Sequence, residues 1–118
     1  MEPGGAEKAV SQLRRGVLEF CVLALLRDGE RYGVEILREL GAVDALVTSE
    51  GTIYPLLSRL RKEHLVETVW RESPTGPPRR YYRLTTTGEK ALADFSTEWR
   101  RFRDGVEYFL SPDGSVEE

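Results

Sequence analysis

The sequence predicts a mainly α-helical fold with a small β-hairpin. Two stretches support this prediction: a short amphipathic helix at Ser49–Lys62, and a basic hairpin with a Pro/Gly-rich turn at Pro74–Thr85. A helix that can enter a groove, followed by a basic β-hairpin, is the layout of a winged helix-turn-helix. Near the C-terminus, aromatic residues at heptad spacing indicate an appended dimerisation helix. Because of the helix and the basic hairpin, nucleic acid is the first partner to test.

Length and composition are those of one soluble globular domain. The chain has 118 residues, of which 40% are hydrophobic and 31% charged, so it has room for one core and an appended helix. The longest apolar run, Val17–Leu26, includes Glu19 and is too short to span a bilayer. The first residues also lack the pattern of a secretory signal. One cysteine, Cys21, cannot form an internal disulfide, so we expect a cytoplasmic protein without a membrane partner.

The overall charge and its distribution point in different directions. A net charge of −3 and a pI of about 5.3 argue, taken alone, against DNA binding. Phosphate contacts are local, however, because charges are screened beyond roughly 8–10 Å at physiological salt. The segment Ser49–Arg83 has seven basic and four acidic residues, a net charge of +3. The acidic balance resides elsewhere, including the C-terminal tail.

The first helix is expected at Val10–Arg27, after an N-terminal segment, residues 1–9, that we expect to be flexible. Between Val17 and Leu26 it is apolar on almost every side, whereas a surface helix shows a single apolar stripe. A helix buried all round in so small a domain needs two partners, its own core and a second subunit. Val17, Phe20 and Cys21 are therefore candidate interface residues. Cys21 is interpreted as a small buried hydrophobe rather than a redox sensor.

The next helix is expected at Tyr32–Leu40, where apolar residues are spaced for one buried face and Gly41 ends the pattern. Ala42–Thr48 is a connector. Ser49 then stands as the N-cap of the third helix, with an acidic residue following in the first turn. The apolar arc of this third helix comprises Ile53, Leu56, Leu57, Leu60 and His64.

The opposite arc of the third helix is unusual for a face that is only solvated. Gly51 and Pro55 lower helix stability, by roughly 1 and 3 kcal/mol at interior positions, and do not improve solubility. Small residues allow close approach, while Tyr54, Ser58 and Lys62 offer groups suited to phosphates and base edges. The alternative to DNA contact is that this arc is an ordinary solvated polar face. With the hairpin arginines, the predicted DNA-contacting residues are Ser49, Gly51, Thr52, Tyr54, Pro55, Ser58, Arg59, Lys62, Arg79 and Arg80.

The hairpin is expected to consist of a strand at Leu65–Arg71, a turn at Ser73–Pro78 and a return strand at Arg79–Leu84. Alternation along the return strand places Arg80 on one face with Tyr82, which we expect in the core, and Arg79 on the other. The two arginines are interpreted as phosphate contacts, and the alternative is an ordinary charged strand edge.

The final helix begins at Thr85 or Thr86, and Thr86 would form a capping box with Glu89. Its apolar residues are spaced three and four apart, as in a heptad seam: Leu92, Phe95, Trp99, Phe102, Val106 and Phe109. A winged domain is complete before this seam, so another copy of the chain is its expected partner. The expected division is residues 10–86 for the winged helix-turn-helix, 87–110 for the dimerisation helix and 111–118 for a flexible acidic tail.

Several stretches resemble the PadR family of transcriptional regulators, and together they run from about residue 12 to residue 110. The most specific are GTIYPLL at Gly51–Leu57 and RYYRLT at Arg80–Thr85. Further matches are LRRGVLEFCVLALL (Leu13–Leu26), RYGVEI (Arg31–Ile36), SEGTIYPLLSRLRKEHLV (Ser49–Val66) and PPRRYYRLTTTGEKAL (Pro77–Leu92).

The resemblance implies a homodimer of the short subfamily, in which the C-terminal helix packs against the first helix of the partner and the protein represses transcription from a pseudo-palindromic operator. The family's common G-R-P wing turn is Gly76-Pro77-Pro78 here, so wing affinity would rest more on Arg79 and Arg80. Trp99 resembles a tryptophan that lines a pore for planar aromatic effectors in some members. Phe95 and Phe102 would line the same effector site. The alternative at Trp99 is dimer packing without a ligand.

Other classes of function have little support in the sequence. One Cys and one His do not supply the three or four ligands that a zinc or copper site requires, so no metal or other cofactor is expected. Catalysis lacks a nucleophile–base arrangement and a phosphate-binding glycine loop. The remaining alternative is a winged-helix module that binds a protein instead of DNA. Operator, regulated genes, effector and sign of regulation cannot be derived from the sequence.

Overall fold

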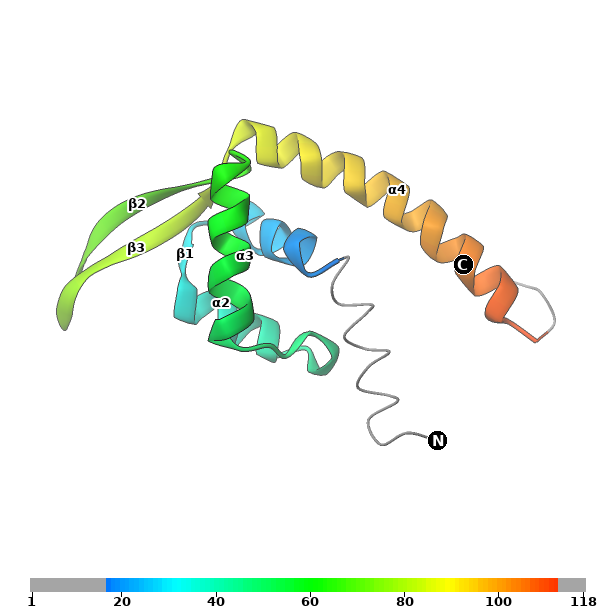
Figure 1. Ribbon diagram of the computed structural model, residues 1–118, viewed down its shortest axis with the longest axis horizontal. Coiled ribbons are helices and arrows are strands. Elements are labelled where there is room, and N and C mark those ends of the chain that lie inside the picture. Colours follow the sequence, from blue (N-terminus) through cyan, green and yellow to red (C-terminus); the bar gives the residue numbers. More distant parts are fainter. Residues whose placement is uncertain (1–16, 113–118) are drawn as a thin grey trace.

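The computed structural model describes residues 17–112 (Figure 1). A helix covering residues 17–27 comes first. The following elements are β1 (Arg31–Tyr32), α2 (Gly33–Gly41), the 3-10 helix η1 (Asp44–Leu46), α3 (Glu50–Lys62), β2 (Val66–Ser73), β3 (Gly76–Leu84) and α4 (Thr86–Leu110). The flexible segment expected at residues 1–9, the start of the first helix from Val10, and residues 113–118 of the expected tail lie outside the described range. The predicted mainly α-helical fold with a small hairpin is confirmed.

The three strands form an antiparallel sheet of order β1-β3-β2, from which Val66 and Tyr82 join the core that the helices form. The hairpin strands β2 and β3 pair over most of their length, and β1 pairs with β3 on its other side, with Tyr32 opposite Tyr81. Strand β1 was not predicted, because two residues are too few to show alternation. Tyr32 therefore belongs to a strand, and the helix expected from that residue begins one position later. The connector expected at Ala42–Thr48 contains η1.

The hydrophobic core joins the first helix, α2, α3, the base of the hairpin and the start of α4. Each element contributes the apolar face that its periodicity predicts, and Tyr82 joins the core as expected. The buried residues are Leu18, Val22, Leu23, Leu26, Ile36, Leu40, Ile53, Leu56, Leu57, Leu60, Val66, Tyr82 and Leu92. This packing holds the buried face of α3 against the core and directs its opposite face to solvent.

The turn of the hairpin is shorter than expected. We predicted a turn over Ser73–Pro78, but β2 continues to Ser73 and β3 begins at Gly76, so that only Pro74 and Thr75 lie between the strands. Pro77 and Pro78 are strand residues next to this turn. Proline is tolerated there because a strand end loses few ladder hydrogen bonds when one N–H is missing.

His64 corrects a second prediction, since we expected it on the buried arc of the third helix. Helix α3 ends at Lys62, and His64 follows in the left-handed conformation, with φ of 62°, and with its side chain exposed. A non-glycine residue with positive φ is uncommon, and here it turns the chain from α3 into β2. The carbonyl oxygen of His64 accepts a hydrogen bond from Thr85 Oγ1 at 2.7 Å. Among the described interactions, His64 therefore contributes through its backbone carbonyl and not through its imidazole.

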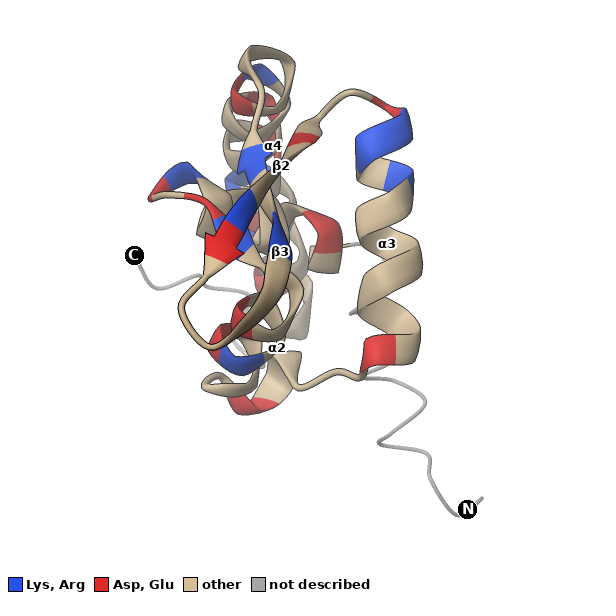
Figure 2. Cartoon of the chain, turned by 90° about the vertical axis from the view of Figure 1, so that its left-hand side faces the viewer, with Lys and Arg blue, Asp and Glu red and all other residues tan. Residues whose placement is uncertain are grey.

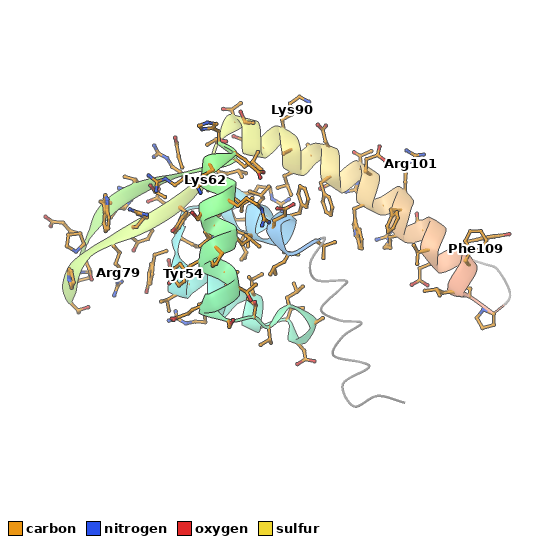
Figure 3. The ribbon with its side chains drawn as sticks, in the orientation of Figure 1. Tyr54, Lys62, Arg79, Lys90, Arg101 and Phe109 are labelled. Atoms are coloured by element: carbon orange, nitrogen blue, oxygen red, sulfur yellow. The ribbon has the colours of Figure 1, made fainter. Side chains whose placement is uncertain are left out.

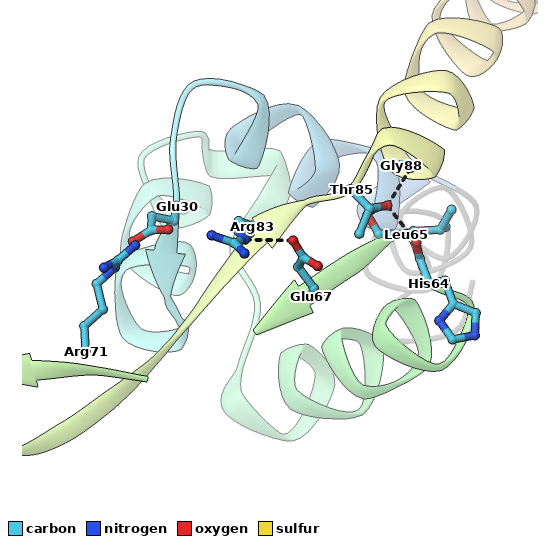
Figure 4. Close-up of polar contacts among 8 residues, drawn as sticks. All are labelled: Glu30, His64, Leu65, Glu67, Arg71, Arg83, Thr85 and Gly88. Carbon is cyan, nitrogen blue, oxygen red and sulfur yellow. Dashed lines mark hydrogen bonds and ion pairs between the residues drawn. The ribbon is translucent and has the colours of Figure 1, made fainter. Parts of the chain in front are cut away.

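The start of α4 is fixed against the base of the hairpin (Figure 4). Thr85 is the N-cap: its Oγ1 accepts from the Gly88 N–H at 2.9 Å, while its hydroxyl lies 3.0 Å from the Leu65 carbonyl oxygen. The capping box expected from Thr86 does not form, because Thr86 is already the first helical residue. A Cβ on Gly88 would lie 2.1 Å from the Leu65 carbonyl oxygen, so the helix approaches this closely only with glycine at that position.

Helix α4 then extends away from the rest of the molecule (Figure 1). Its N-terminal part belongs to the winged domain, since Gly88 is buried and Leu92 is 6% exposed in the domain's own core. Its C-terminal part, from Trp99 onward, has few neighbours among the described residues. None of the helices within residues 17–112 is long and apolar enough to cross a membrane.

Candidate nucleic-acid interface and subunit face

All of the residues in and next to α3 that were predicted to contact DNA are exposed to solvent. Because Ile53, Leu57 and Leu60 are buried in the core, the opposite arc is turned to solvent. The exposed residues are Ser49, Gly51, Thr52, Tyr54, Pro55, Ser58, Arg59 and Lys62. Figure 2 shows basic residues at the C-terminal end of α3, an acidic residue at its start and a long uncharged stretch between them.

The start of α3 differs in one detail from the expected N-cap. Ser49 has the extended backbone of an N-cap residue, but its side chain makes no capping hydrogen bond and instead lies 3.5 Å from Thr52 Oγ1. A Cβ on Gly51 would meet only Ser49 Oγ, at 3.7 Å. Packing within the chain therefore does not require glycine at position 51, and the open backbone there can admit a closely approaching partner.

Tyr54 is held between α3 and the start of α2. Its ring lies against Gly33, where an added Cβ would be 2.6 Å from the tyrosine hydroxyl and ring. Partial burial, with a smaller contribution from Glu50, raises the pKa of Tyr54 above its ordinary value. The hydroxyl therefore stays protonated at neutral pH and can donate a hydrogen bond. In Figure 3, Tyr54 and Lys62 lie at different heights along α3, and Arg79 lies on the hairpin.

The basic side chains of α3 and the hairpin fall into two groups. Arg59 bonds Glu19 of the first helix at 2.8 Å, Arg83 bonds Glu67 at 2.8 Å, and Arg71 bonds Glu30 (Figure 4). The hydrogen bond that Arg59 donates to Glu19 raises the pKa of Arg59. Within residues 17–112, the basic side chains of these elements without a carboxylate partner are Arg61, Lys62, Arg79 and Arg80.

The division into paired and unpaired cations changes which basic residues are expected to contact DNA. Arg59, which was expected to contact DNA, is half-exposed but already neutralised by Glu19. Arg61 was not selected, although it is exposed and has no ion-pair partner among the described residues. Counting charge along the sequence could have suggested Arg61, but only the structure shows which cations are paired. The uncompensated positive charge of α3 is therefore at its C-terminal end.

The two hairpin arginines point to opposite faces of the sheet, as alternation predicts. The Arg79 guanidinium lies over the Tyr32 ring, 4.5 Å from its centroid, and Tyr32 packs edge-on against Tyr81. The Arg80 guanidinium lies over the Trp70 ring at 5.1 Å. Both aromatic partners were missed, because nothing in the local sequence shows which ring an arginine will cover. Each cation is held in place by an aromatic ring rather than by an acid.

The second surface is the seam of the first helix and α4. Phe20 and Phe95 stack with ring centroids 3.9 Å apart, and Trp99 continues the stack, with its ring 6.0 Å from that of Phe95. Val17 and Cys21 are half-buried on the first helix, and burial raises the pKa of the Cys21 thiol.

Beyond Trp99 the seam residues are exposed: Phe102 is 67% exposed and Phe109 88%, with Val106 between them. Figure 3 places Phe109 at the far end of α4. Leu92 differs from the rest of the predicted interface set, because the chain's own core already covers it.

No metal centre is formed by the part of the chain that the structure describes. Residues 17–112 contain no group of three or more His, Cys, Asp or Glu side chains that could hold an ion. The site is thus a surface: one exposed polar helix, a hairpin with two arginines stacked on aromatic rings, and an apolar seam on the first helix and α4. This combination is that of a winged-helix protein.

Comparison with known proteins agrees with this class. Residues 22–94 match the model of the transcriptional regulator PadR-like family. A transcriptional regulator from Streptococcus is 39% identical, with a TM-score of 0.74, covering 85% of this chain and 98% of that one. A PadR-like transcriptional regulator from Bacillus cereus is 38% identical, with a TM-score of 0.77 and coverage of 85% and 97%. A PadR family transcriptional regulator from Eggerthella lenta has a TM-score of 0.80 at 32% identity, with coverage of 91% and 93%. The chain belongs to the PadR-like family of transcriptional regulators.

Proposed function

We propose that this protein is a DNA-binding transcriptional repressor that acts as a homodimer on a pseudo-palindromic operator. The observation that carries the proposal is the exposed face of α3, where an uncharged stretch is followed by Arg61 and Lys62, which have no acidic partner within residues 17–112. Uncharged small and polar residues suit base edges, and unpaired cations suit phosphates. The hairpin beside α3 adds Arg79 and Arg80, which would contact the flanking backbone. Such a regulator works where the DNA is, so the proposed location is the cytoplasm.

The proposed dimer is formed by the seam of α4 and the first helix. Exposed aromatic residues at heptad spacing, such as Phe102 and Phe109, favour burial against a second copy. Residues 10–86 would then form the DNA-binding unit and residues 87–110 the dimerisation helix, although Gly88 and Leu92 also belong to the core of the winged unit. In a two-fold dimer, two α3 helices about 34 Å apart would enter successive major grooves.

We further propose that a planar aromatic effector binds at the seam and changes the DNA affinity of the dimer. The stack of Phe20, Phe95 and Trp99 supports this, because a flat ring could extend it on the open side of Trp99. Titrating phenolic and polycyclic aromatic compounds while recording tryptophan fluorescence and DNA affinity tests it. Compounds that quench Trp99 without any change in affinity would contradict the effector role.

The central test is a gel-shift assay with the duplex immediately upstream of the protein's own gene, at physiological salt with non-specific competitor DNA. A discrete shift that resists competitor supports the proposal, and footprinting should then show two protected half-sites one helical turn apart. If neither this duplex nor a genome-wide selection of fragments is bound, the net charge of −3 favours the alternative, a winged module that binds a protein. We assign no catalytic role to the chain.

A further inference from the structure

Trp70 is an exposed tryptophan that neither the core nor the proposed dimer seam explains. It lies on β2, in the part of the hairpin that projects beyond the core, and is 62% exposed. Large aromatic side chains usually contribute buried area, so an exposed tryptophan on a projecting strand suggests a partner. The only ring contact described for it is with the Arg80 guanidinium, which lies 5.1 Å from the ring centroid.

The register of the hairpin shows where this pair points. Val66 is opposite Leu84, Thr68 is opposite Tyr82, and Trp70 is opposite Arg80. Because side chains alternate along a strand, these pairs share one face of the sheet. Val66 and Tyr82 are buried on that face together with core residues of α3. Trp70 and Arg80 therefore continue the α3 side of the sheet outward toward the hairpin turn.

The donors of the Arg80 guanidinium have no hydrogen-bond partner within residues 17–112. Its Nε is buried and has no hydrogen-bond partner among the described residues. Buried donors without partners are rare, because each forfeits the hydrogen bond it made with water. Only Nε is affected, so the two terminal nitrogens remain available to an acceptor outside the chain. The Trp70 ring thus holds a cation whose outer donors are unused.

We propose that Trp70 and Arg80 form a single DNA-contact unit, which we call the Trp70–Arg80 pair. The exposed edge of the Trp70 ring packs on deoxyribose beside the groove that α3 enters, and the Arg80 guanidinium donates to the adjacent phosphate. Duplex DNA is the occupant because four cations of α3 and the hairpin have no carboxylate partner within residues 17–112, whereas Arg59, Arg71 and Arg83 are paired. The unpaired cations are Arg61, Lys62, Arg79 and Arg80. This inference rests on the proposed function and adds Trp70, a residue that charge alone would not select.

The first experiment measures binding of a fluorescein-labelled duplex by anisotropy over a range of salt concentrations. Two duplexes are used, one from upstream of the gene and one of random sequence, because a backbone contact does not depend on sequence. Trp70→Ala should weaken binding to both about fivefold to tenfold, as expected for the loss of on the order of 50 Å² of apolar contact. The slope of log affinity against log salt should not change, because no charge is removed.

Arg80→Ala should instead lower the magnitude of that slope by about 0.9, the value for one phosphate contact. The double variant should lose less affinity than the product of the two single effects, because the residues act together. Trp70→Phe should recover most of the affinity, since it retains a ring over Arg80. Arg100→Ala is the matched control: it removes an exposed arginine of α4 without a described ion-pair partner and should leave binding unchanged.

The second experiment reads Trp70 directly, by ¹⁹F NMR of the full chain containing 5-fluorotryptophan. The chain has two tryptophans, Trp70 and Trp99. The signal that is lost in Trp70→Phe belongs to Trp70, and the remaining signal belongs to Trp99. Adding the duplex should shift the Trp70 signal. If the wild type binds duplex while that signal stays in place and Trp70→Ala binds within about twofold of it, the inference is wrong and the proposed function stands. If the wild type binds neither duplex, both are wrong.

Discussion

The two halves of α4 carry the same heptad pattern but differ in what covers it. In the first half, Leu92 lies in the core of the winged domain and Phe95 stacks on Phe20. In the second half, Phe102 and Phe109 are exposed and no described residue covers them. One helix therefore completes a domain with its N-terminal half and presents an apolar surface with its C-terminal half. Stability within one protomer should depend on the first half, and association on the second.

The largest expected difference between the halves is at their glycines. Gly88→Ala should destabilise the fold by about 3 kcal/mol or more, because the new Cβ would lie 2.1 Å from the backbone oxygen of Leu65, which cannot move without shifting β2. Gly105→Ala is the matched control. It meets nothing within 4 Å and should stabilise the helix by about 0.5–1 kcal/mol. Urea unfolding followed by circular dichroism measures both, and equal effects would break the comparison.

Apolar truncations should separate the two halves by their dependence on protein concentration. Leu92→Ala removes a buried side chain and should lower the free energy of unfolding by about 2–5 kcal/mol at every concentration. Phe102→Ala should leave the protomer intact and weaken association by about 2–4 kcal/mol, as for a residue central to an interface. Sedimentation equilibrium gives the association constant. If the monomeric Phe102→Ala protein is unfolded, the C-terminal half of α4 also stabilises the single protomer.

The sequence was a better guide to elements than to their junctions. Helices with clear apolar periodicity, including α3 and α4, were predicted within a few residues, and Tyr82 was correctly placed in the core. The errors lie where a long-range contact decides the local structure. His64 leaves the helical pattern to make a turn, and Thr85 caps α4 while its hydroxyl bonds the carbonyl oxygen of His64 in that turn. Neither interaction has a periodic signature in the sequence.

The candidate DNA-contacting surface shows the same division between what the sequence could and could not predict. Exposure of the selected face of α3 follows from the helical wheel alone. Pairing does not: Arg59 is neutralised by Glu19, 40 positions earlier in the chain, whereas Lys62 has no acidic partner among the described residues. Likewise Arg79 and Arg80 are neighbours in sequence but cover different rings on opposite faces. Partners so distant in sequence leave no trace in local composition.

The difference between these two α3 cations leads to a smaller predicted effect, on DNA affinity. Lys62→Ala should weaken binding a few-fold and lower the salt slope by about 0.9, because one phosphate contact is lost. Arg59→Ala, the matched variant on the same helix, should leave the slope unchanged, because its charge is already balanced by Glu19. Anisotropy titrations at several salt concentrations measure both. A reduced slope for Arg59→Ala would mean that DNA breaks the ion pair and that Arg59 contacts phosphate after all.

The smallest expected effect concerns the attachment of the hairpin to the winged domain through Glu30 and Arg71. The hydrogen bond from Arg71 lowers the pKa of Glu30 below its ordinary value of 4.5. A lowered pKa in the folded state contributes stability that is present above the unfolded pKa and is lost as the pH falls through the folded one. Glu30→Gln should therefore unfold at a slightly lower temperature than the wild type at pH 7. The difference should shrink as the pH falls below 4.5 and vanish once the pH is below the lowered pKa of Glu30 in the folded state. Thermal unfolding at a series of pH values measures this, and a difference that persists in acid would assign the effect to packing of the side chain instead of its charge.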